Sequence, residues 1–169
     1  APGGVSVEIG TRAGGTALMF LLALKEMYED PPFLLTVDPY GEKDYSPSVI
    51  DETDYRYGDV FYLRAKALLA RFPNHAHFLL RGEDFWQLAP MPLFHRGESR
   101  RLGDLTFVFL DGDLSPPSVV ADAAMAMRFL RPGGIVLIDN INWSGNITPA
   151  LGAFGKVLRG AERWLALTK

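Results

Sequence analysis

Short apolar runs alternate with helix-like segments along almost the whole chain, and this alternation strongly limits the possible folds. The strand-like runs are residues 5–9, 33–37, 76–80, 105–110 and 135–138. Between them lie segments whose apolar residues recur at helical spacing, at 16–27, 60–72, 84–88 and 117–130. Strands that alternate with helices are typical of a parallel sheet with helices on both faces. We therefore predict an α/β fold with a doubly wound, mainly parallel sheet.

The last part of the chain and two connecting segments are less regular. We predict a final helix over residues 148–158 and a sixth strand over 164–167, so part of a terminal antiparallel hairpin is expected to be missing. Residues 40–58 and 90–103 are predicted to be irregular connections. Because 169 residues with 48% hydrophobic content suit one well-packed domain better than two, residues 1–169 are predicted to form a single domain.

Charge and composition exclude several classes of protein. A formal net charge of −3 and a pI near 5.6 give no basic footprint, so we expect no nucleic-acid partner. No apolar run approaches the roughly 20 residues that span a bilayer, so we expect no membrane partner and a cytoplasmic location. Because the chain has no cysteine, any metal must be held by oxygen ligands or by histidines. We interpret His75, His77 and His95 as structural or solvent-facing.

A glycine turn follows the first predicted strand, in the segment VSVEIGTRAGGT from Val5 to Thr16. A helix that begins after such a turn presents free backbone N–H groups at the carboxyl edge of a sheet, where a nucleotide-like ligand can bind. The spacing is not that of a dinucleotide fold, because Arg12 stands where a second glycine would allow close approach to a pyrophosphate. A dehydrogenase is therefore disfavoured. A tight turn without a ligand is the simpler alternative.

Oxygen-bearing side chains follow two of the later predicted strands. Asp111 comes directly after residues 105–110, and Asp139 and Asn140 come directly after residues 135–138. Adjacent strand ends of a parallel sheet lie close enough to share one ion, and carboxylate and amide oxygens are the ligands that Mg²⁺ prefers. The pattern predicts a metal site at Asp111, Asp139 and Asn140. The alternative is that the aspartates cap helices or face water.

These motifs resemble a known family. The pattern EIGxxxGGT from Glu8 to Thr16 is similar to the first motif of class I S-adenosylmethionine-dependent methyltransferases, in particular the cation-dependent O-methyltransferases related to catechol and caffeoyl-CoA O-methyltransferases. The run DNINWSG over residues 139–145 looks like the DNxxWxG segment of the caffeoyl-CoA branch. The resemblance extends over residues 4–145 in motif order. It implies a Rossmann-like fold, S-adenosylmethionine as cofactor and Mg²⁺ or another divalent cation.

The resemblance and the chemistry of the cofactor together assign binding residues. Backbone N–H groups of the turn suit the methionine carboxylate, Glu8 suits the ammonium, and Asp38 suits both ribose hydroxyls. After the third strand the family usually places a carboxylate that accepts from the adenine amine, a role open to Glu83 or Asp84. The full predicted set is Glu8, Gly10, Thr11, Gly14, Gly15, Thr16, Asp38, Gly82, Glu83, Asp84 and Asp111.

The same resemblance implies a reaction. A small-molecule acceptor, either a phenol or a vicinal diol, binds the metal through its hydroxyl oxygens, and one of these attacks the methyl group of the sulfonium. Asp111 is expected to act catalytically as a ligand of the metal. Catechol-type enzymes carry a lysine shortly after the first metal aspartate as the base, and this chain has none there, so either Asp113 is the nearest substitute or the metal alone suffices. The acceptor is not identified by the sequence, and a homodimer is allowed.

Two other classes of function remain open at this point. A metal-independent small-molecule methyltransferase would keep the cofactor site and use Asp139 and Asn140 only structurally. A non-catalytic domain that binds a cofactor or a partner fits the absence of a lysine base. The first alternative predicts turnover that resists chelation, and the second predicts binding without methyl transfer.

Overall fold

The computed structural model describes residues 4–40, 58–95, 98–101, 105–113, 115–141, 148–160 and 165–168. Its main feature is a seven-stranded sheet in the order β3-β2-β1-β6-β7-β9-β8. The five strands β3, β2, β1, β6 and β7 run parallel, while β9 is antiparallel to both β7 and β8. The strands are β1 (Val5–Ile9), β2 (Phe33–Val37), β3 (His75–Phe78), β6 (Leu105–Leu110), β7 (Leu130–Ile138), β8 (Lys156–Gly160) and β9 (Leu165–Thr168).

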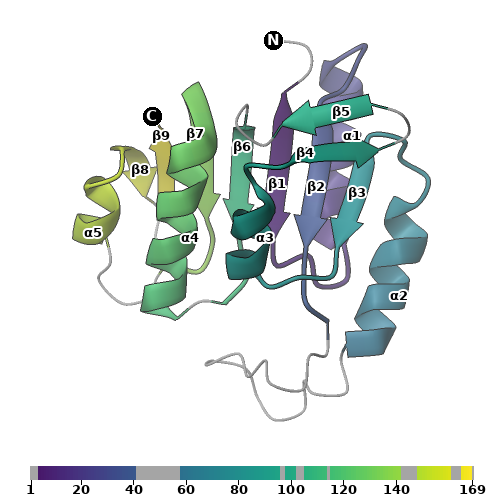
Figure 1. Cartoon of the computed structure of the whole chain (residues 1–169), viewed down its shortest axis with the longest axis horizontal. Helices are drawn as coiled ribbons and strands as arrows, with labels where there is room; N and C mark the ends of the chain where they lie inside the picture. The colour runs from purple at the N-terminus through teal and green to yellow at the C-terminus, as the bar shows by residue number, and fades with distance from the viewer. Residues whose placement is uncertain are drawn as a thin grey trace.

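Helices cover both faces of this sheet, as the alternation of the sequence predicts. Figure 1 shows α3 and α4 in front of the sheet and α1 behind it. The helices are α1 (Gly15–Met27), α2 (Gly58–Leu69), α3 (Gly82–Leu88), α4 (Pro116–Phe129) and α5 (Thr148–Gly152). The predicted α/β, doubly wound architecture is confirmed. Within the ranges that the structure describes, no helix combines the length and the apolar character needed to cross a membrane.

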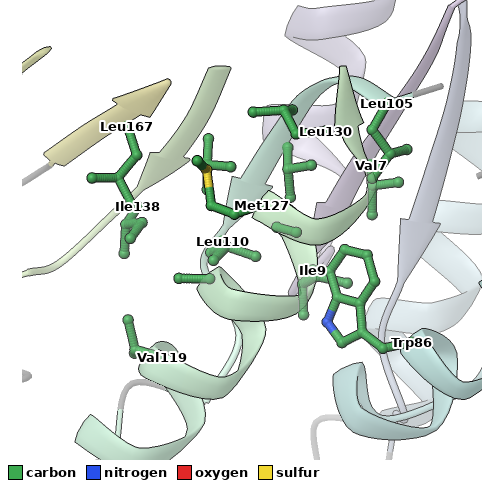
Figure 2. Packing of buried hydrophobic residues seen from close by; sticks show 14 of the residues in the cluster. Val7, Ile9, Trp86, Leu105, Leu110, Val119, Met127, Leu130, Ile138 and Leu167 are labelled. Atoms are coloured by element: carbon green, nitrogen blue, oxygen red, sulfur yellow. The ribbon is translucent and has the colours of Figure 1, made fainter. Parts of the chain in front are cut away.

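Two apolar clusters hold the helices to the sheet. In the larger one, Val119 and Met127 of α4 lie over strand residues such as Leu110, and Trp86 of α3 packs beside them (Figure 2). The smaller cluster joins α1, α2 and β2 through Ala17, Leu21, Leu34, Ala65, Leu69 and Phe72. The strands therefore bury apolar side chains on both faces, which explains why their sequences read as continuous apolar runs.

The end of the chain differs from the prediction. The helix ends at Gly152 instead of continuing to residue 158, and residues 156–160 form β8. A Cβ on Gly155 would lie 2.7 Å from the backbone oxygen of Thr168 in β9 and 2.3 Å from Met127 Cε, so the glycine allows the chain to pass close to the last strand. The expectation that part of the terminal hairpin is missing is also wrong, because β8 and β9 form an antiparallel pair beside β7.

Part of the connection predicted over residues 90–103 is regular. Strands β4 (Pro92–His95) and β5 (Glu98–Arg101) pair in antiparallel fashion, with Pro92 opposite Arg101. Proline at the first residue of a strand is compatible with pairing because it removes only one donor. The proline- and charge-rich composition of this segment hid the hairpin from sequence reasoning.

The strand order reverses between β1 and β6, and this point organises the candidate site. From β1 the chain passes outward through β2 to β3, and it returns to the other side of β1 as β6. In open α/β sheets, ligands bind outside the carboxyl ends of the strands at such a switch point. The glycine turn follows β1, and Asp111 follows β6.

Candidate functional site

Hydrogen bonds between neighbouring strand ends bring three predicted site residues to one edge of the sheet. Gly10 donates its N–H to Val37 O at 2.8 Å, and Asp111 donates to Ile9 O at 2.9 Å. Asp139 in turn donates to Leu110 O at 2.9 Å. The carboxyl ends of β2, β1, β6 and β7 are thus adjacent, and the two sequence motifs separated by more than 120 residues share this edge.

The turn between β1 and α1 has a left-handed backbone at three positions. Gly10 has φ of 91°, Arg12 of 50° and Gly14 of 80°. A Cβ at Gly10 would lie 2.2 Å from Asp111 O, so the glycine is required by both its backbone conformation and its surroundings. Gly14 is the N-cap of α1, and no side chain caps the helix there. The first N–H groups of α1, which begins at Gly15 and Thr16, are therefore left without a side-chain cap.

Asp38 follows β2 and is bound to the glycine turn. Its Oδ2 accepts the backbone N–H of Arg12 at 2.8 Å, and its Oδ1 accepts that of Tyr40 at 3.1 Å. Burial raises the pKa of Asp38 above its ordinary value, while hydrogen bonds from the backbone N–H groups of Arg12, Tyr40 and Thr11 act in the opposite direction. A carboxylate has about four acceptor sites, so three such bonds leave about one for a ligand.

Glu8 lies inside β1 and is completely buried. Neither of its carboxylate oxygens has a hydrogen-bond partner among the residues that the structure describes. The nearby Thr11 hydroxyl donates instead to Val37 O at 3.4 Å. Burial, followed by the negative charge of Asp111, raises the pKa of Glu8 well above its ordinary value. A buried carboxyl group without a partner is costly, and it fits a site that awaits a cationic ligand group.

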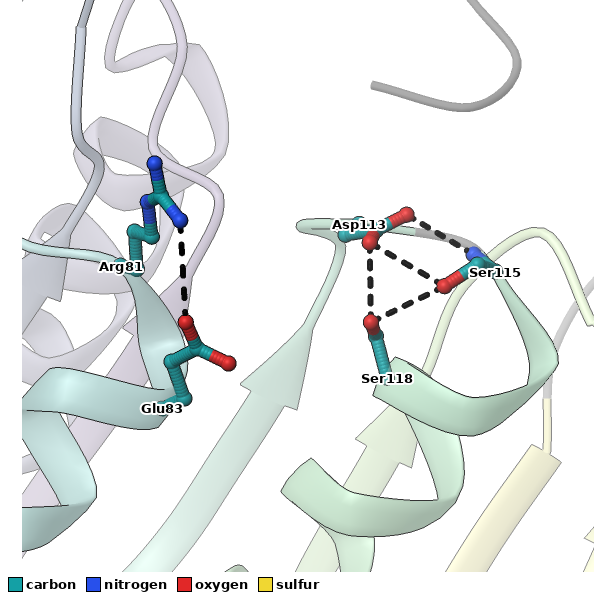
Figure 3. Close-up of polar contacts among 5 residues, drawn as sticks. All are labelled: Arg81, Glu83, Asp113, Ser115 and Ser118. Atoms are coloured by element: carbon teal, nitrogen blue, oxygen red, sulfur yellow. Dashed lines mark hydrogen bonds and ion pairs between the residues drawn. The ribbon is translucent and has the colours of Figure 1, made fainter. Parts of the chain in front are cut away.

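The residues predicted to meet adenine lie at the start of α3. Glu83 is 72% exposed and forms an ion pair with Arg81 at 3.8 Å (Figure 3), whereas Asp84 is half-buried. Gly82 packs against a carboxylate that sequence reasoning missed, since a Cβ there would lie 3.0 Å from Asp122 Oδ1. The structure leaves the choice between Glu83 and Asp84 open.

Asp122 lies on the otherwise apolar inner face of α4, among residues such as Val119 and Ala123. Its Oδ1 accepts the indole N–H of Trp86 at 2.9 Å. Burial, with a smaller contribution from the charges of Asp113 and Glu83, raises the pKa of Asp122 to about 6. An acidic residue at helical spacing with buried apolar neighbours was the signal in the sequence.

The proposed metal ligands follow β6 and β7. Asn140 Nδ2 lies 3.2 Å from Asp111 Oδ1, and Asn140 has a φ of 51°. Rotation of the amide exchanges its nitrogen and oxygen, so this pair also fits two oxygens that face one cation. Among the described residues there is no group of three or more histidine or acidic side chains that could hold a metal. Two carboxylates and an amide remain a suitable donor set for Mg²⁺. The rest of the motif, residues 142–145, lies outside the described residues.

Asp113 holds the beginning of α4. It accepts hydrogen bonds from the backbone N–H of Ser115 at 2.9 Å, from Ser115 Oγ at 3.1 Å and from Ser118 Oγ at 2.8 Å (Figure 3). These bonds form an Asx turn just before α4, so the carboxylate has a local structural role. The catalytic role predicted for Asp113 has to compete with that role.

Comparisons with known proteins agree with this site. A family model described as a methyltransferase domain matches residues 7–141. No curated protein matches the chain significantly. Among solved structures, a Methanococcus jannaschii fibrillarin pre-rRNA processing protein has a TM-score of 0.62 at 13% identity. The O-methyltransferase TomG from Streptomyces achromogenes, involved in tomaymycin synthesis and solved with S-adenosylmethionine, has a TM-score of 0.59 at 18% identity.

A third neighbour acts on RNA according to its description. This 16S rRNA adenine N1-methyltransferase from Catenulisporales acidiphilia, also solved with the cosubstrate, has a TM-score of 0.53 at 18% identity. Each comparison covers 98% of the present chain, which spans 66% of the fibrillarin, 73% of TomG and 83% of the rRNA enzyme. Identities this low establish the fold alone, whereas the family model spans the glycine turn, Asp38, Asp111 and Asp139. The chain belongs to the class I S-adenosylmethionine-dependent methyltransferases.

Proposed function

We propose that the protein transfers the methyl group of S-adenosylmethionine to an oxygen of a small hydroxylated acceptor, a phenol or a vicinal diol, with the help of Mg²⁺. The observation that carries the cofactor assignment is the arrangement at the β1–β6 switch point. There an uncapped helix N-terminus, the buried Glu8 and the turn-bound Asp38 lie at one sheet edge. These groups match the carboxylate, ammonium and ribose of the cofactor.

Each part of the cofactor has a proposed partner in the chain. The backbone N–H groups of Gly15 and Thr16 bind the methionine carboxylate. Gly10, Thr11 and Gly14 shape the turn beside it, because the N–H groups of Gly10 and Gly14 already donate to Val37 O and Thr11 O. Glu8 ionises when it pairs with the ammonium, which compensates for its burial. Asp38 accepts one ribose hydroxyl through its remaining acceptor site. The residues at the start of α3 contact the adenine.

Asp111, Asp139 and Asn140 are the proposed ligands of the divalent cation. When bound, Mg²⁺ supplies Lewis-acid chemistry that lowers the pKa of an acceptor hydroxyl and orients it. Asp111, which follows β6, lies beside Asn140, and Asp139, the residue before Asn140, is hydrogen-bonded through its backbone N–H to the end of β6. This edge also carries the proposed cofactor groups, so the acceptor and the methyl donor are brought together by one set of strand ends.

Asp113 is the proposed proton acceptor. To take a proton from the acceptor hydroxyl, its carboxylate has to exchange one of its serine hydrogen bonds for that hydroxyl. Replacement of Asp113 by Asn would remove the base but would also weaken the hydrogen bonds that hold the segment before α4. A Ser118→Ala variant, which removes only one of these hydrogen-bond partners, separates the two effects, because it leaves the carboxylate in place.

The preference for a small acceptor over RNA rests on charge. The candidate edge carries Asp38, Asp111 and Asp139, and the chain has a formal net charge of −3. A phosphate backbone would be repelled by this edge. Among the structural neighbours described above, TomG is an O-methyltransferase, which agrees with the proposal.

Calorimetric titration with S-adenosylhomocysteine, in Mg²⁺ and again in EDTA, tests the cofactor site without knowledge of the acceptor. We expect micromolar binding in both conditions. A screen of phenols and vicinal diols with S-adenosylmethionine then tests the reaction, with chelation as the test of metal dependence. Absence of binding in both buffers would contradict the proposed function. Turnover that resists EDTA would favour a metal-independent methyltransferase, and binding without any turnover would favour a non-catalytic domain.

A further inference from the structure

Tyr40, two residues beyond Asp38, makes hydrogen bonds to two parts of the proposed cofactor site, namely Asp38 and the glycine turn. Its backbone N–H donates to Asp38 Oδ1 at 3.1 Å, and its phenol hydroxyl donates to the carbonyl oxygen of Arg12. Asp38 Oδ2 accepts the N–H of the same Arg12 at 2.8 Å. Three hydrogen bonds thus close a ring through Tyr40, Asp38 and Arg12, and both backbone groups of Arg12 are fixed.

The residue held in this ring has a conformation that is unfavourable for it. Arg12 has a φ of 50°, a left-handed backbone that costs a non-glycine residue about 1 kcal/mol or more. It stands in the middle of the turn, between Gly10 and Gly14. Hydrogen bonds to its N–H and C=O groups offset that cost. Without them the turn would relax toward conformations that aim its N–H groups elsewhere.

The ring of Tyr40 is itself well supported. Its centroid lies 5.5 Å from that of Tyr62 on α2 and 5.3 Å from that of His77 on β3. Burial, followed by the charges of Asp38 and Glu8, raises the pKa of the Tyr40 hydroxyl above its ordinary value, so it stays protonated and remains a donor. The contacts fix the direction of the phenol before any ligand arrives.

We propose that Tyr40 is a positioning residue of the cofactor site, whose hydroxyl holds the Arg12 carbonyl so that the glycine turn is ready for the amino-acid end of the ligand. This inference rests on the proposed function, because that function assigns the turn to the methionine carboxylate. The ribose carboxylate Asp38 is held mainly by backbone N–H groups, which a change of the phenol leaves in place. The effect of the hydroxyl should therefore be confined to one end of the ligand.

Tyr40→Phe removes the hydroxyl and keeps the ring contacts with Tyr62 and His77. We expect the Kd for S-adenosylhomocysteine to rise about three- to tenfold, the range for one lost hydrogen bond. The Kd for 5′-methylthioadenosine, which lacks the amino-acid end, should change less than about twofold, well below that range. Tyr62→Phe is the matched control: it also removes a phenol hydroxyl from this aromatic cluster, and that hydroxyl makes no hydrogen bond within the described ranges. Its affinity for both ligands should equal that of the wild type.

Hydrogen–deuterium exchange of the unliganded protein provides a readout that does not depend on the cofactor. Amides of the turn around Arg12 should exchange faster in Tyr40→Phe than in Tyr62→Phe, at equal unfolding midpoints. Equal weakening of both ligands, unchanged affinity for S-adenosylhomocysteine, or unchanged exchange in the turn would each overturn the positioning role. If the wild type fails to bind S-adenosylhomocysteine, the proposed function fails, and the positioning role fails with it. In that case, faster exchange of the turn amides in Tyr40→Phe would show only that Tyr40 shapes the turn.

Discussion

Gly10 lies against the main chain of Asp111, so that a Cβ at Gly10 would stand 2.2 Å from the Asp111 carbonyl oxygen and 2.4 Å from its carbonyl carbon. This contact joins the turn after β1 to the residue after β6, at the point where the strand order reverses. The neighbouring atoms are backbone and cannot move without shifting a strand end. The proposed cofactor and metal sites are therefore coupled through one glycine.

Gly10→Ala should destabilise the protein and abolish the binding of S-adenosylhomocysteine. The φ of 91° and the collision with Asp111 together predict a loss of about 3 kcal/mol or more in the free energy of unfolding. Gly15→Ala is the control, because nothing lies within 4 Å of its Cβ and the position is the first residue of α1. Urea unfolding curves should separate the two variants. Equal stability of the two would show that the turn adapts.

Asp38→Ala should weaken the binding of S-adenosylhomocysteine by about tenfold or more while the protein stays folded. The variant removes the acceptor for the ribose and also releases the N–H groups of Arg12 and Tyr40. Asp30→Ala, at an exposed position, removes the same charge away from the site and should leave affinity unchanged. Calorimetry gives both values. An Asp38→Ala protein with the affinity of the wild type would remove the ribose assignment.

The sequence predicted the central strands well because their apolar runs are continuous. The predicted bounds of β1, β2 and β6 agree with the structure, and the turn chemistry after β1 follows from local glycine spacing. The predicted end of the last helix was wrong because residues 156–160 pair with β9 as a strand, and this pairing depends on residues outside the segment. Contacts of that kind are invisible to periodicity.

In the candidate site too, features set by local sequence were predictable and features set by distant contacts were not. Residues at strand ends, such as Asp38 and Asp139, were predictable because parallel strands end at one edge. The hydrogen bonds of Asp113 to Ser115 and Ser118 depend on two serine rotamers, and the closeness of Asp122 to Gly82 depends on the packing of α3 against α4. Sequence spacing contains neither. The partnership between Tyr40 and Arg12 spans 28 positions and likewise follows only from the fold.

Asp139→Asn should weaken the binding of Mg²⁺ by about tenfold or more, because the affinity of an oxygen site depends on the charge of its ligands. The binding of S-adenosylhomocysteine should be retained, since Asp139 is not among the proposed cofactor groups. Titration of Mg²⁺ into the complex with S-adenosylhomocysteine measures the first effect. Asp30→Asn controls for the general loss of a charge. Unchanged Mg²⁺ affinity would argue for a metal-independent enzyme.

Thr36→Val should lower the free energy of unfolding by about 1–3 kcal/mol. Thr36 is fully buried, and its hydroxyl lies 2.9 Å from His75 Nε2 and 2.6 Å from His77 Nδ1. Valine has almost the same shape and removes only the hydroxyl, so a buried ring nitrogen loses its partner. Thr36→Ser keeps the hydroxyl and removes a methyl group, and it should cost less. If the serine variant were the less stable one, packing would outweigh these hydrogen bonds.

Asp122→Asn should change how stability depends on pH. The pKa of Asp122 is raised by burial to about 6 in the folded protein, against an ordinary value of 3.8, so the folded state holds the proton more tightly than the unfolded state does. The wild type therefore loses stability as the pH rises from 3.8 to about 6, and the loss persists above that window. The asparagine variant does not ionise and therefore lacks this pH-dependent loss of stability. The unfolding free energy of Asp122→Asn minus that of the wild type should increase by about 1–3 kcal/mol between pH 4 and pH 7. Urea titrations at four pH values measure it, with Asp30→Asn as the exposed control. A difference that stays constant over this range would mean that burial does not raise the pKa of Asp122 in the folded protein.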